Sequence, residues 1–332
     1  MSEVIKAISL FSGGLDSMLS IKMMTNQGID VTAIHIKTGF GGTKDVSDVL
    51  EARAKMAGAN FRIIDVREDY IQKVLFTPKY GYGKNFNPCI DCHGYMFTVG
   101  KAIMRELGAS FIFTGEVVGQ RPMSQRADAM RQVANIADDK EEKLILRPLS
   151  AKLMDITTPE ANGWVDREKL YDISGRSRQR QLELAESFGW DDYESPGGGC
   201  LLTEAHYSDR IREFISYDKD FDIDDIEILK FGRQFRLDDG VKLAVGRNQE
   251  DNLGLQNIDS LKYSVIKLPI AGPYSLIGSN ATQSEKELAS KIAITYAKSS
   301  PSEKYSVEIG DEVFEVSPFE EKKDAQQYFF NR

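Results

Sequence analysis

The chain has 332 residues, which is long for one domain and predicts two or three. Its composition, with 41% hydrophobic and 28% charged residues, is that of an ordinary globular protein. The net charge of -9 argues against indiscriminate binding of polyanions, although a local basic face would still bind them. No apolar run approaches the ~20 residues that span a bilayer. Lys6 interrupts the first apolar run, so we expect a cytoplasmic protein without a signal peptide.

Short apolar runs alternate with helical patterns over residues 1–150. The predicted strands cover residues 7–11, 31–36, 61–66 and 110–114. The predicted helices cover residues 17–27, 46–57 and 94–107, with stops at Gly28, Gly58 and Gly108. This alternation predicts an α/β fold in which a parallel sheet carries helices on both faces. Ligands of such sheets bind at the carboxyl ends of the strands.

The pattern changes twice after residue 150. Helices are predicted at residues 167–171 and 177–188, followed by a glycine-rich loop at residues 195–200. Strands are then predicted at residues 226–231, 242–245, 263–268, 305–309 and 312–316, with a helix at residues 284–297. We therefore predict an α/β domain at residues 1–150, a helical extension at 151–221 and a small α+β domain at 222–332.

A glycine-rich turn follows the first predicted strand and leads directly into the first predicted helix. It reads Ser12-Gly13-Gly14-Leu15-Asp16-Ser17. The two glycines let the backbone approach a ligand closely, and the start of the helix favours an anion. Ser12 and Ser17 add hydroxyl donors, and Asp16 either holds a magnesium ion or caps the helix. We interpret this turn as a phosphate loop, although it lacks the Gly-Lys-Ser/Thr of a Walker loop.

The turn resembles the pyrophosphate loop of the PP-loop ATP pyrophosphatases, which fold as HUP-like domains. Those enzymes split ATP between its α and β phosphates and pass AMP to an oxygen of the acceptor. The resemblance implies ATP and Mg²⁺ as cofactors, with Asp16 essential for the adenylation step. The nucleotide would be bound by Ser12, Gly13, Gly14, Asp16 and Ser17, and its adenine by the end of the second strand at Ala33, Ile34 and Ile36.

Two further stretches resemble tRNA thiouridine synthases. Residues 87–92, Asn-Pro-Cys-Ile-Asp-Cys, are similar to the Asn-Pro-x-x-x-Cys segment of bacterial 2-thiouridylases, where the last cysteine is catalytic. Residues 114–120, Thr-Gly-Glu-Val-Val-Gly-Gln, resemble a segment of the 4-thiouridine synthases, as do Ser124-Gln125 and Arg147-Pro148-Leu149. The resemblance implies tRNA as the acceptor and adds Gly115 and Gln120 to the nucleotide site.

The three cysteines form a Cys-x-x-Cys pair, Cys89 and Cys92, and a remote Cys200. Three thiolates are one short of closing a zinc or iron–sulfur site. Some tRNA thiolases hold a 4Fe-4S cluster with such a set, and this resemblance favours all three as cluster ligands. Two alternatives stay open: a persulfide on Cys200 resolved by Cys92, or three small buried apolar side chains. Zinc completed by His93 is a weaker variant, and Asp91 is either an acid/base or a capping residue.

Several arginines are candidates for RNA contact. Arg121 and Arg126 follow Gln120, and Arg176 and Arg178 form a second cluster. Residues 231–237 and 245–252 resemble the RNA-associated module of NFACT-type proteins and carry the last two candidates, Arg233 and Arg247. For any one of these arginines the alternative is a solvated surface position.

Taken together, these features predict an ATP-dependent tRNA sulfurtransferase that releases AMP and pyrophosphate. Asp16, Cys92 and Cys200 are the predicted catalytic residues. The rival interpretation is a PP-loop enzyme that amidates or sulfurates a small molecule. The sequence leaves open whether the sulfur donor is sulfide or a donor protein, which uridine atom is replaced, and whether the chain forms a homodimer.

Overall fold

The computed structural model describes residues 4–194, 199–258 and 261–330. The chain divides into two compact units, Met1–Thr203 and Glu204–Arg332. Residues 151–203 group with the first unit, and the predicted division into three domains stays a prediction. Residues 195–198 of the predicted glycine-rich loop lie outside the described residues. Among the described residues, none of the helices combines the length and the apolar character that crossing a membrane requires.

The first unit is built on a parallel sheet with the strand order β3-β2-β1-β4-β5. Its strands are β1 (Lys6–Leu10), β2 (Asp30–Lys37), β3 (Asn60–Asp65), β4 (Phe111–Thr114) and β5 (Ile145–Leu146). β1 pairs with β2 on one side and with β4 on the other. Because the chain first extends the sheet toward β3 and then returns to place β4 beside β1, the order reverses between β1 and β4. This reversal is where open α/β sheets bind their ligands.

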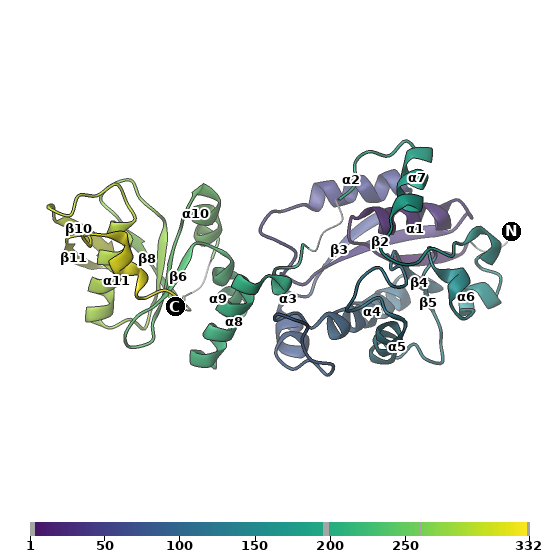
Figure 1. Ribbon diagram of the computed structural model, residues 1–332, viewed down its shortest axis with the longest axis horizontal. Helices are drawn as coiled ribbons and strands as arrows, with labels where there is room; N and C mark the ends of the chain where they lie inside the picture. The colour runs from purple at the N-terminus through teal and green to yellow at the C-terminus, as the bar shows by residue number, and fades with distance from the viewer. Residues whose placement is uncertain (1–3, 195–198, 259–260, 331–332) are drawn as a thin grey trace. The chain divides into compact units, whose positions relative to one another are not determined.

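Helices cover both faces of this sheet, as the sequence predicted (Figure 1). The longer ones are α1 (Leu15–Thr25), α2 (Ser47–Ala57), α4 (Cys89–Glu106), α5 (Ala127–Ile136) and α7 (Gln179–Ser187). The short ones are α3 (Arg67–Tyr70), η1 (Ile71–Leu75), η2 (Ala151–Leu153), α6 (Thr158–Ala161), η3 (Arg167–Lys169) and η4 (Leu201–Thr203). One apolar core lies between the sheet and α1, α2 and α7, and a second lies between the sheet and α4 and α5.

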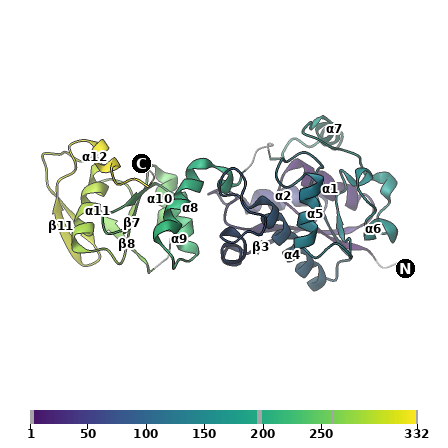
Figure 2. The same ribbon diagram turned by 60° about the horizontal axis from the view of Figure 1, so that its bottom comes forward.

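The second unit contains an antiparallel sheet, part of which is labelled in Figure 2. Its strands have the order β11-β10-β8-β9-β7-β6. Its strands are β6 (Arg233–Arg236), β7 (Lys242–Val245), β8 (Tyr263–Lys267), β9 (Ser275–Gly278), β10 (Tyr305–Ile309) and β11 (Glu312–Val316). Its helices are α8 (Ala205–Tyr217), α9 (Ile223–Glu227), η5 (Ile228–Lys230), α10 (Gln249–Gln256), α11 (Gln283–Thr295) and α12 (Lys322–Gln326). The apolar face of α11 packs on the sheet and closes the core of this unit.

Two local predictions are wrong. Residues 226–231 form the end of α9 and the 3-10 turn η5, whereas the apolar run predicted a strand. The Asp222 side chain accepts hydrogen bonds from the backbone amides of Asp224 and Asp225, and this capping box starts a helix. Residues 167–171 were predicted to be helical, but only the 3-10 turn η3 forms there.

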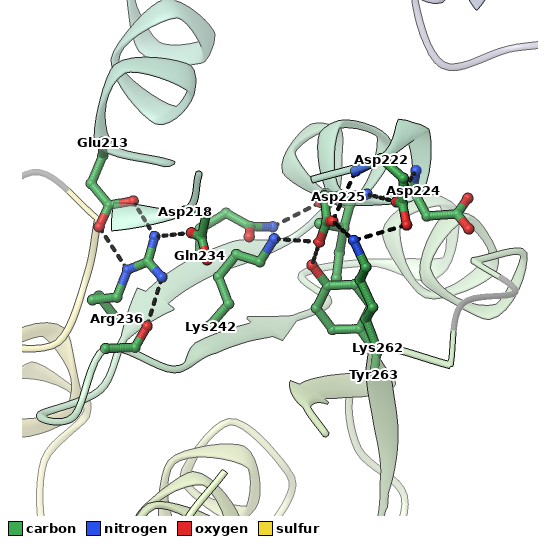
Figure 3. A network of polar contacts seen from close by, with 12 residues as sticks. Glu213, Asp218, Asp222, Asp224, Asp225, Gln234, Arg236, Lys242, Lys262 and Tyr263 are labelled. Atoms are coloured by element: carbon green, nitrogen blue, oxygen red, sulfur yellow. Dashed lines mark hydrogen bonds and ion pairs between the residues drawn. The ribbon is translucent and has the colours of Figure 1, made fainter. Parts of the chain in front are cut away.

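A buried polar network lies within the second unit (Figure 3). The Asp225 carboxylate, 8% exposed, accepts hydrogen bonds from Lys242 Nζ at 3.1 Å, from Lys262 Nζ at 2.9 Å and from the Tyr263 hydroxyl. Burial by itself raises the pKa of Asp225. The charge of Lys242 and the hydrogen bonds from Tyr263 and Lys262 outweigh burial and hold this pKa at about 2.

Asp225→Asn should therefore destabilise the second unit by about 3–5 kcal/mol, because it leaves the buried Lys242 ammonium without its nearest counter-charge. Hydrogen exchange of peptides from residues 204–330, measured in the full chain, would report the loss. Asp238→Asn, in the exposed turn before β7, is the matched control and should change exchange little. Equal exchange protection in the two variants would contradict the structural role of Asp225.

The same carboxylate should make the stability of this unit depend on acid. Its folded-state pKa of about 2 lies below the ordinary value of 3.8, so the stabilisation is present above pH ~4 and is lost as the pH falls toward 2. Between pH 4 and 2 the free energy of unfolding of the second unit should therefore fall less steeply in Asp225→Asn than in the wild type.

Candidate active site

The loops that follow β1 and β4 meet at the point where the strand order reverses. Gly115, directly after β4, lies against the backbone of the first turn of α1. A Cβ atom at this position would stand 2.4 Å from the backbone nitrogen of Ser17 and 2.5 Å from the carbonyl carbon of Asp16. No real Cβ contact is that short, so only glycine fits here. The predicted site residues Asp16, Ser17 and Gly115 are thus brought together.

The β1–α1 loop has the local geometry of an anion-binding turn. Gly13 adopts a φ of +82°, a left-handed backbone conformation that would be strained in a residue with a side chain. Gly14 precedes the first turn of α1, and its carbonyl accepts a hydrogen bond from Ser17 Oγ at 2.7 Å. The Gly14 amide in turn donates to Ser12 Oγ at 3.3 Å. The loop therefore presents the amino-terminal end of an 11-residue helix, whose dipole favours a phosphate group.

The Asp16 carboxylate is held by one oxygen and leaves the other available. Gln120 Nε2 donates a hydrogen bond of 2.7 Å to Asp16 Oδ2. Asp16 Oδ1 is buried and has no hydrogen-bond partner among the described residues. A buried carboxylate oxygen without a partner is costly, and a divalent cation satisfies it. Magnesium typically takes one or two protein carboxylates together with substrate phosphates, so Asp16 fits a magnesium ion that arrives with ATP.

The three residues predicted to contact adenine lie within β2, where their side chains are buried. Ala33 belongs to the core under α1, whereas Ile34 and Ile36 belong to the core under α4. The Ile34 carbonyl accepts a hydrogen bond from the amide of Phe11. Adenine contact through these side chains is therefore blocked by packing, and a contact at the end of β2 would have to use main-chain atoms. The adenine assignment stays a prediction.

The three cysteines come from two segments, and none of them forms a disulfide. Cys89 and Cys92 lie in the first turns of α4, three residues apart, and so share one face of the helix. α4 begins five residues before the helix that the sequence predicted. Cys200 precedes η4, in a segment that is tied down by a hydrogen bond from the Leu201 amide to the Phe40 carbonyl, 2.9 Å long.

Two polar side chains reach the thiols. Asn87 Nδ2 donates to Cys89 Sγ at 3.0 Å. Tyr70, 1% exposed, donates its hydroxyl to Cys92, and its ring packs against Phe40 with 5.7 Å between centroids. Phe40 thus contacts both Tyr70 and the segment that carries Cys200. No sequence signal pointed to Tyr70, because it lies in a short helix outside the motifs.

The three sulfur atoms lie within electrostatic range of one another. Burial raises the pKa of Cys92 to about 12; the Tyr70 hydrogen bond opposes this rise, and Cys200 and Cys89 add to it. The pKa of Tyr70 is raised well above its ordinary value, chiefly by burial and then by Cys92. No three His, Cys, Asp or Glu side chains of the described residues are arranged around a single metal ion. Thiolates are the ordinary ligands of iron–sulfur clusters, so the three cysteines fit such a group by their chemistry, and its presence stays a prediction.

The buried Glu116 connects α4, the cysteine helix that carries Cys89 and Cys92, to the end of β4 at Gly115. Glu116, 4% exposed, accepts hydrogen bonds from His93 Nδ1 at 2.8 Å and from Arg147 Nε at 2.9 Å. Burial raises the pKa of Glu116, but the Arg147 charge and the contacts of His93 outweigh it and leave the pKa below its ordinary value. Glu116 and Arg147 belong to the quoted motifs, yet the sequence did not mark them as site residues.

Asp91 plays a different part from its neighbours in the motif. It is 7% exposed, and its two oxygens accept hydrogen bonds from the backbone amides of Lys79, at 2.8 Å, and Tyr80, at 3.0 Å. Both oxygens are thus used to hold the segment before α4. Of the two roles considered for Asp91, this geometry favours the structural one.

The candidate RNA-contacting arginines differ in how they are held. In the first unit Arg121, Arg126 and Arg176 are exposed, and Arg178 is half-buried. Arg126 pairs with Asp128 at 2.9 Å. In the second unit, Arg233 donates to the Gly246 carbonyl and lies 4.4 Å from the Tyr296 ring centroid. Arg247 forms an ion pair with Asp251 at 2.7 Å. The RNA-binding role of these arginines stays a prediction.

Two family models match this chain. The tRNA methyl transferase HUP domain matches residues 5–159, which include the phosphate loop, Cys89, Cys92 and Glu116. The NFACT protein RNA binding domain matches residues 232–329 of the second unit. The first match covers the sheet and its ligand-binding edge, and the second covers the antiparallel sheet with α11.

The curated relatives carry the name tRNA-specific 2-thiouridylase MnmA. The protein of Helicobacter hepaticus is 28% identical over 158 residues, which are 45% of this chain and 44% of the relative. That of Nitrobacter winogradskyi is 24% identical over 223 residues, 62% of this chain and 52% of the relative. The chain thus spans about half the length of these relatives.

A solved structure of a 4-thiouridine synthetase–RNA complex with bound ATP is 20% identical and has a TM-score of 0.39. The matched region covers 55% of this chain and 40% of the solved chain, and a likeness this weak supports no conclusion. The matches confirm the resemblance predicted from the sequence: residues 5–159 are similar to the tRNA methyl transferase HUP domain, part of the chain is similar to tRNA-specific 2-thiouridylases, and residues 232–329 are similar to the NFACT protein RNA binding domain.

Proposed function

We propose that this protein adenylates a uridine of tRNA with ATP and then replaces the activated oxygen with sulfur. The observation that carries the proposal is a continuous series of contacts from the phosphate loop to the thiols. Gly115 packs on Asp16, Glu116 follows Gly115, and Glu116 bonds His93, the neighbour of Cys92. A phosphate loop and three thiols in one region are what adenylation followed by sulfur transfer requires. Similarity to 2-thiouridylases supports the same conclusion.

The first step is the transfer of AMP to the base. The uridine carbonyl oxygen attacks the α-phosphorus of ATP, a carbon–oxygen–phosphorus link forms, and pyrophosphate leaves. The amides at the start of α1, together with Ser12 and Ser17, would stabilise charge on the phosphates. Asp16 would hold Mg²⁺, which neutralises phosphate charge when bound. The close packing of Gly115 on the backbone of Asp16 and Ser17 would hold these hydrogen-bond donors in place before ATP binds.

The second step is displacement of AMP by sulfur. We propose that Cys89, Cys92 and Cys200 hold a 4Fe-4S cluster, which when bound offers an iron without a protein ligand to hydrosulfide. The sulfur forms a bond to the adenylated carbon, and the carbon–oxygen bond to AMP breaks. Tyr70 and Asn87 would orient the thiols of Cys92 and Cys89. Burial, and to a smaller extent the sulfurs of Cys200 and Cys89, raises the pKa of Cys92, and the positive charge of bound iron atoms would oppose this rise.

The tRNA would be held by arginines on both units. Arg121, Arg126, Arg176 and Arg178 belong to the unit that carries the phosphate loop. Arg233 and Arg247 lie in the unit that matches the NFACT RNA binding domain, and Arg233 lies beside the aromatic ring of Tyr296. Guanidinium groups next to aromatic rings suit the phosphates and unstacked bases of an RNA loop.

Thiolation can be tested directly with the purified chain, unmodified tRNA, ATP, Mg²⁺ and sulfide in the absence of oxygen. Nucleoside mass spectrometry should show uridine with one oxygen replaced by sulfur, with one AMP released per thiolated base. Asp16→Asn should abolish AMP formation, because the carboxylate charge that would hold Mg²⁺ is lost. AMP formation that depends on a small molecule and ignores tRNA would instead establish the rival function.

Substitution of each cysteine should separate the two steps. Cys89→Ser, Cys92→Ser and Cys200→Ser should each lose iron and acid-labile sulfide and stop thiolation, while ATP-dependent release of pyrophosphate continues. The chain has three cysteines in all, so the three variants serve as controls for one another. An iron-free protein that still needs Cys92 and Cys200, but not Cys89, would replace the cluster with persulfide chemistry.

Gly115→Ala tests the contact on which the site depends. The added methyl group would force the Asp16–Ser17 backbone aside. A displacement of about 1 Å at a reacting centre can cost about a hundredfold in rate, so pyrophosphate release should fall by about that factor. Gly41→Ala is the matched control, because a Cβ there meets nothing within 4 Å. Equal rates in the two variants would show that the close approach has no part in the chemistry.

A further inference from the structure

The structure contains a second glutamine behind the one that holds Asp16. Gln181 lies in the first turns of α7 and is 0% exposed. Its Nε2 donates a hydrogen bond of 3.3 Å to Gln120 Oε1. Gln120 Nε2 donates in turn to Asp16 Oδ2 at 2.7 Å. The two amides thus form a relay that runs from α7 to the phosphate loop.

The position of Gln181 is unusual for a polar side chain. Residues 181, 184, 185 and 188 recur at helical spacing on the face of α7 that packs toward α1, and the other three are Leu184, Ala185 and Phe188. Gln181 Oε1 is buried without a hydrogen-bond partner among the described residues. A buried amide with an unused acceptor costs free energy that an apolar residue here would avoid. Core packing alone therefore does not account for a glutamine at this position.

The polarity of the relay determines which atoms face Asp16. An amide group has one end that donates and one that accepts. Because Gln181 donates to the oxygen of Gln120, the NH₂ group of Gln120 is directed to the Asp16 carboxylate. That bond fixes Asp16 Oδ2 and so determines where Oδ1, the oxygen without a partner, lies. Both relay members are neutral, so the negative charge of Asp16 remains for a cation.

We propose that Gln181 is a positioning residue that acts through Gln120 to hold Asp16 Oδ1 in place for a divalent cation bound with ATP. The proposal rests on the proposed function only in taking ATP as the ligand. Partners behind a metal ligand orient it, and their loss typically lowers metal affinity about 10- to 100-fold. Gln120 contacts the ligand directly, and Gln181 lies one step farther away. The effect of Gln181 should therefore be at the lower end of this range.

The test is calorimetric titration of the full chain with ATP, once with Mg²⁺ and once with EDTA. Gln181→Met keeps the length of the side chain but removes the amide. It should weaken ATP binding with Mg²⁺ by about tenfold and leave binding in EDTA unchanged, which also shows that the variant is folded. Gln179→Met is the matched control: it removes an exposed glutamine of the same helix that bonds Glu183, and both affinities should stay at the wild-type value.

A double-mutant cycle separates the relay from a local packing effect. Gln120→Met should weaken Mg²⁺-dependent ATP binding at least as much as Gln181→Met. Adding Gln181→Met to Gln120→Met should then have no further effect, because Gln181 no longer has a partner through which to act. Additive losses, or an equal loss with Mg²⁺ and with EDTA, would overturn the relay.

These measurements do not depend on thiolation. Mg²⁺-dependent ATP binding that responds to Gln181 in a protein that does not thiolate tRNA would support the relay and reject the proposed function. Thiolation of tRNA by the wild-type chain, together with unchanged Mg²⁺-dependent ATP binding in Gln181→Met, would support the proposed function and reject the relay. A wild-type chain that does not bind ATP at all would overturn both.

Discussion

The candidate site depends on one close approach, that of the Gly115 backbone to the backbone of Asp16 and Ser17. It occurs between β1 and β4, where the strand order of the parallel sheet reverses and two loops leave the same edge. Everything else in the site follows from it. The residue after Gly115 reaches the cysteine helix through His93, and Gln120, a few positions farther on, reaches Asp16. A larger residue at position 115 would separate the phosphate loop from both.

Glu116 and Asp225 differ from Asp16 in how their carboxylates are satisfied. Glu116 is paired with Arg147, and Asp225 with Lys242 and Lys262. Their charges are neutralised inside the protein, and their pKa values are lowered as a result. Such pairs organise structure, because removing one partner leaves a buried charge unpaired. Asp16 is contacted by one neutral amide group, that of Gln120, and its other oxygen is left without a partner among the described residues. This is the arrangement expected of a carboxylate whose counter-charge comes with a ligand.

The cysteine region is organised by aromatic and amide groups. Tyr70 and Asn87 fix two of the thiols, and Phe40 links the ring of Tyr70 to the backbone of the segment that carries Cys200. Burial and mutual repulsion make a thiolate at Cys92 costly in the protein alone, with its pKa at about 12. A positively charged group shared by the three sulfurs would remove that cost. The proposed 4Fe-4S cluster would supply such a charge.

The sequence by itself determined the parts of this protein that are local. The alternation of apolar strands with helical patterns predicted the α/β fold, and glycine spacing marked residues 12–17 as a candidate phosphate loop, because both signals arise from neighbouring residues. It failed at residues 226–231, where an apolar run predicted a strand but the Asp222 capping box starts a helix. It also missed Tyr70, Arg147 and Gln181, which reach the site from separate segments. Their roles come from distances between residues far apart in the chain, and only the tertiary structure sets those distances.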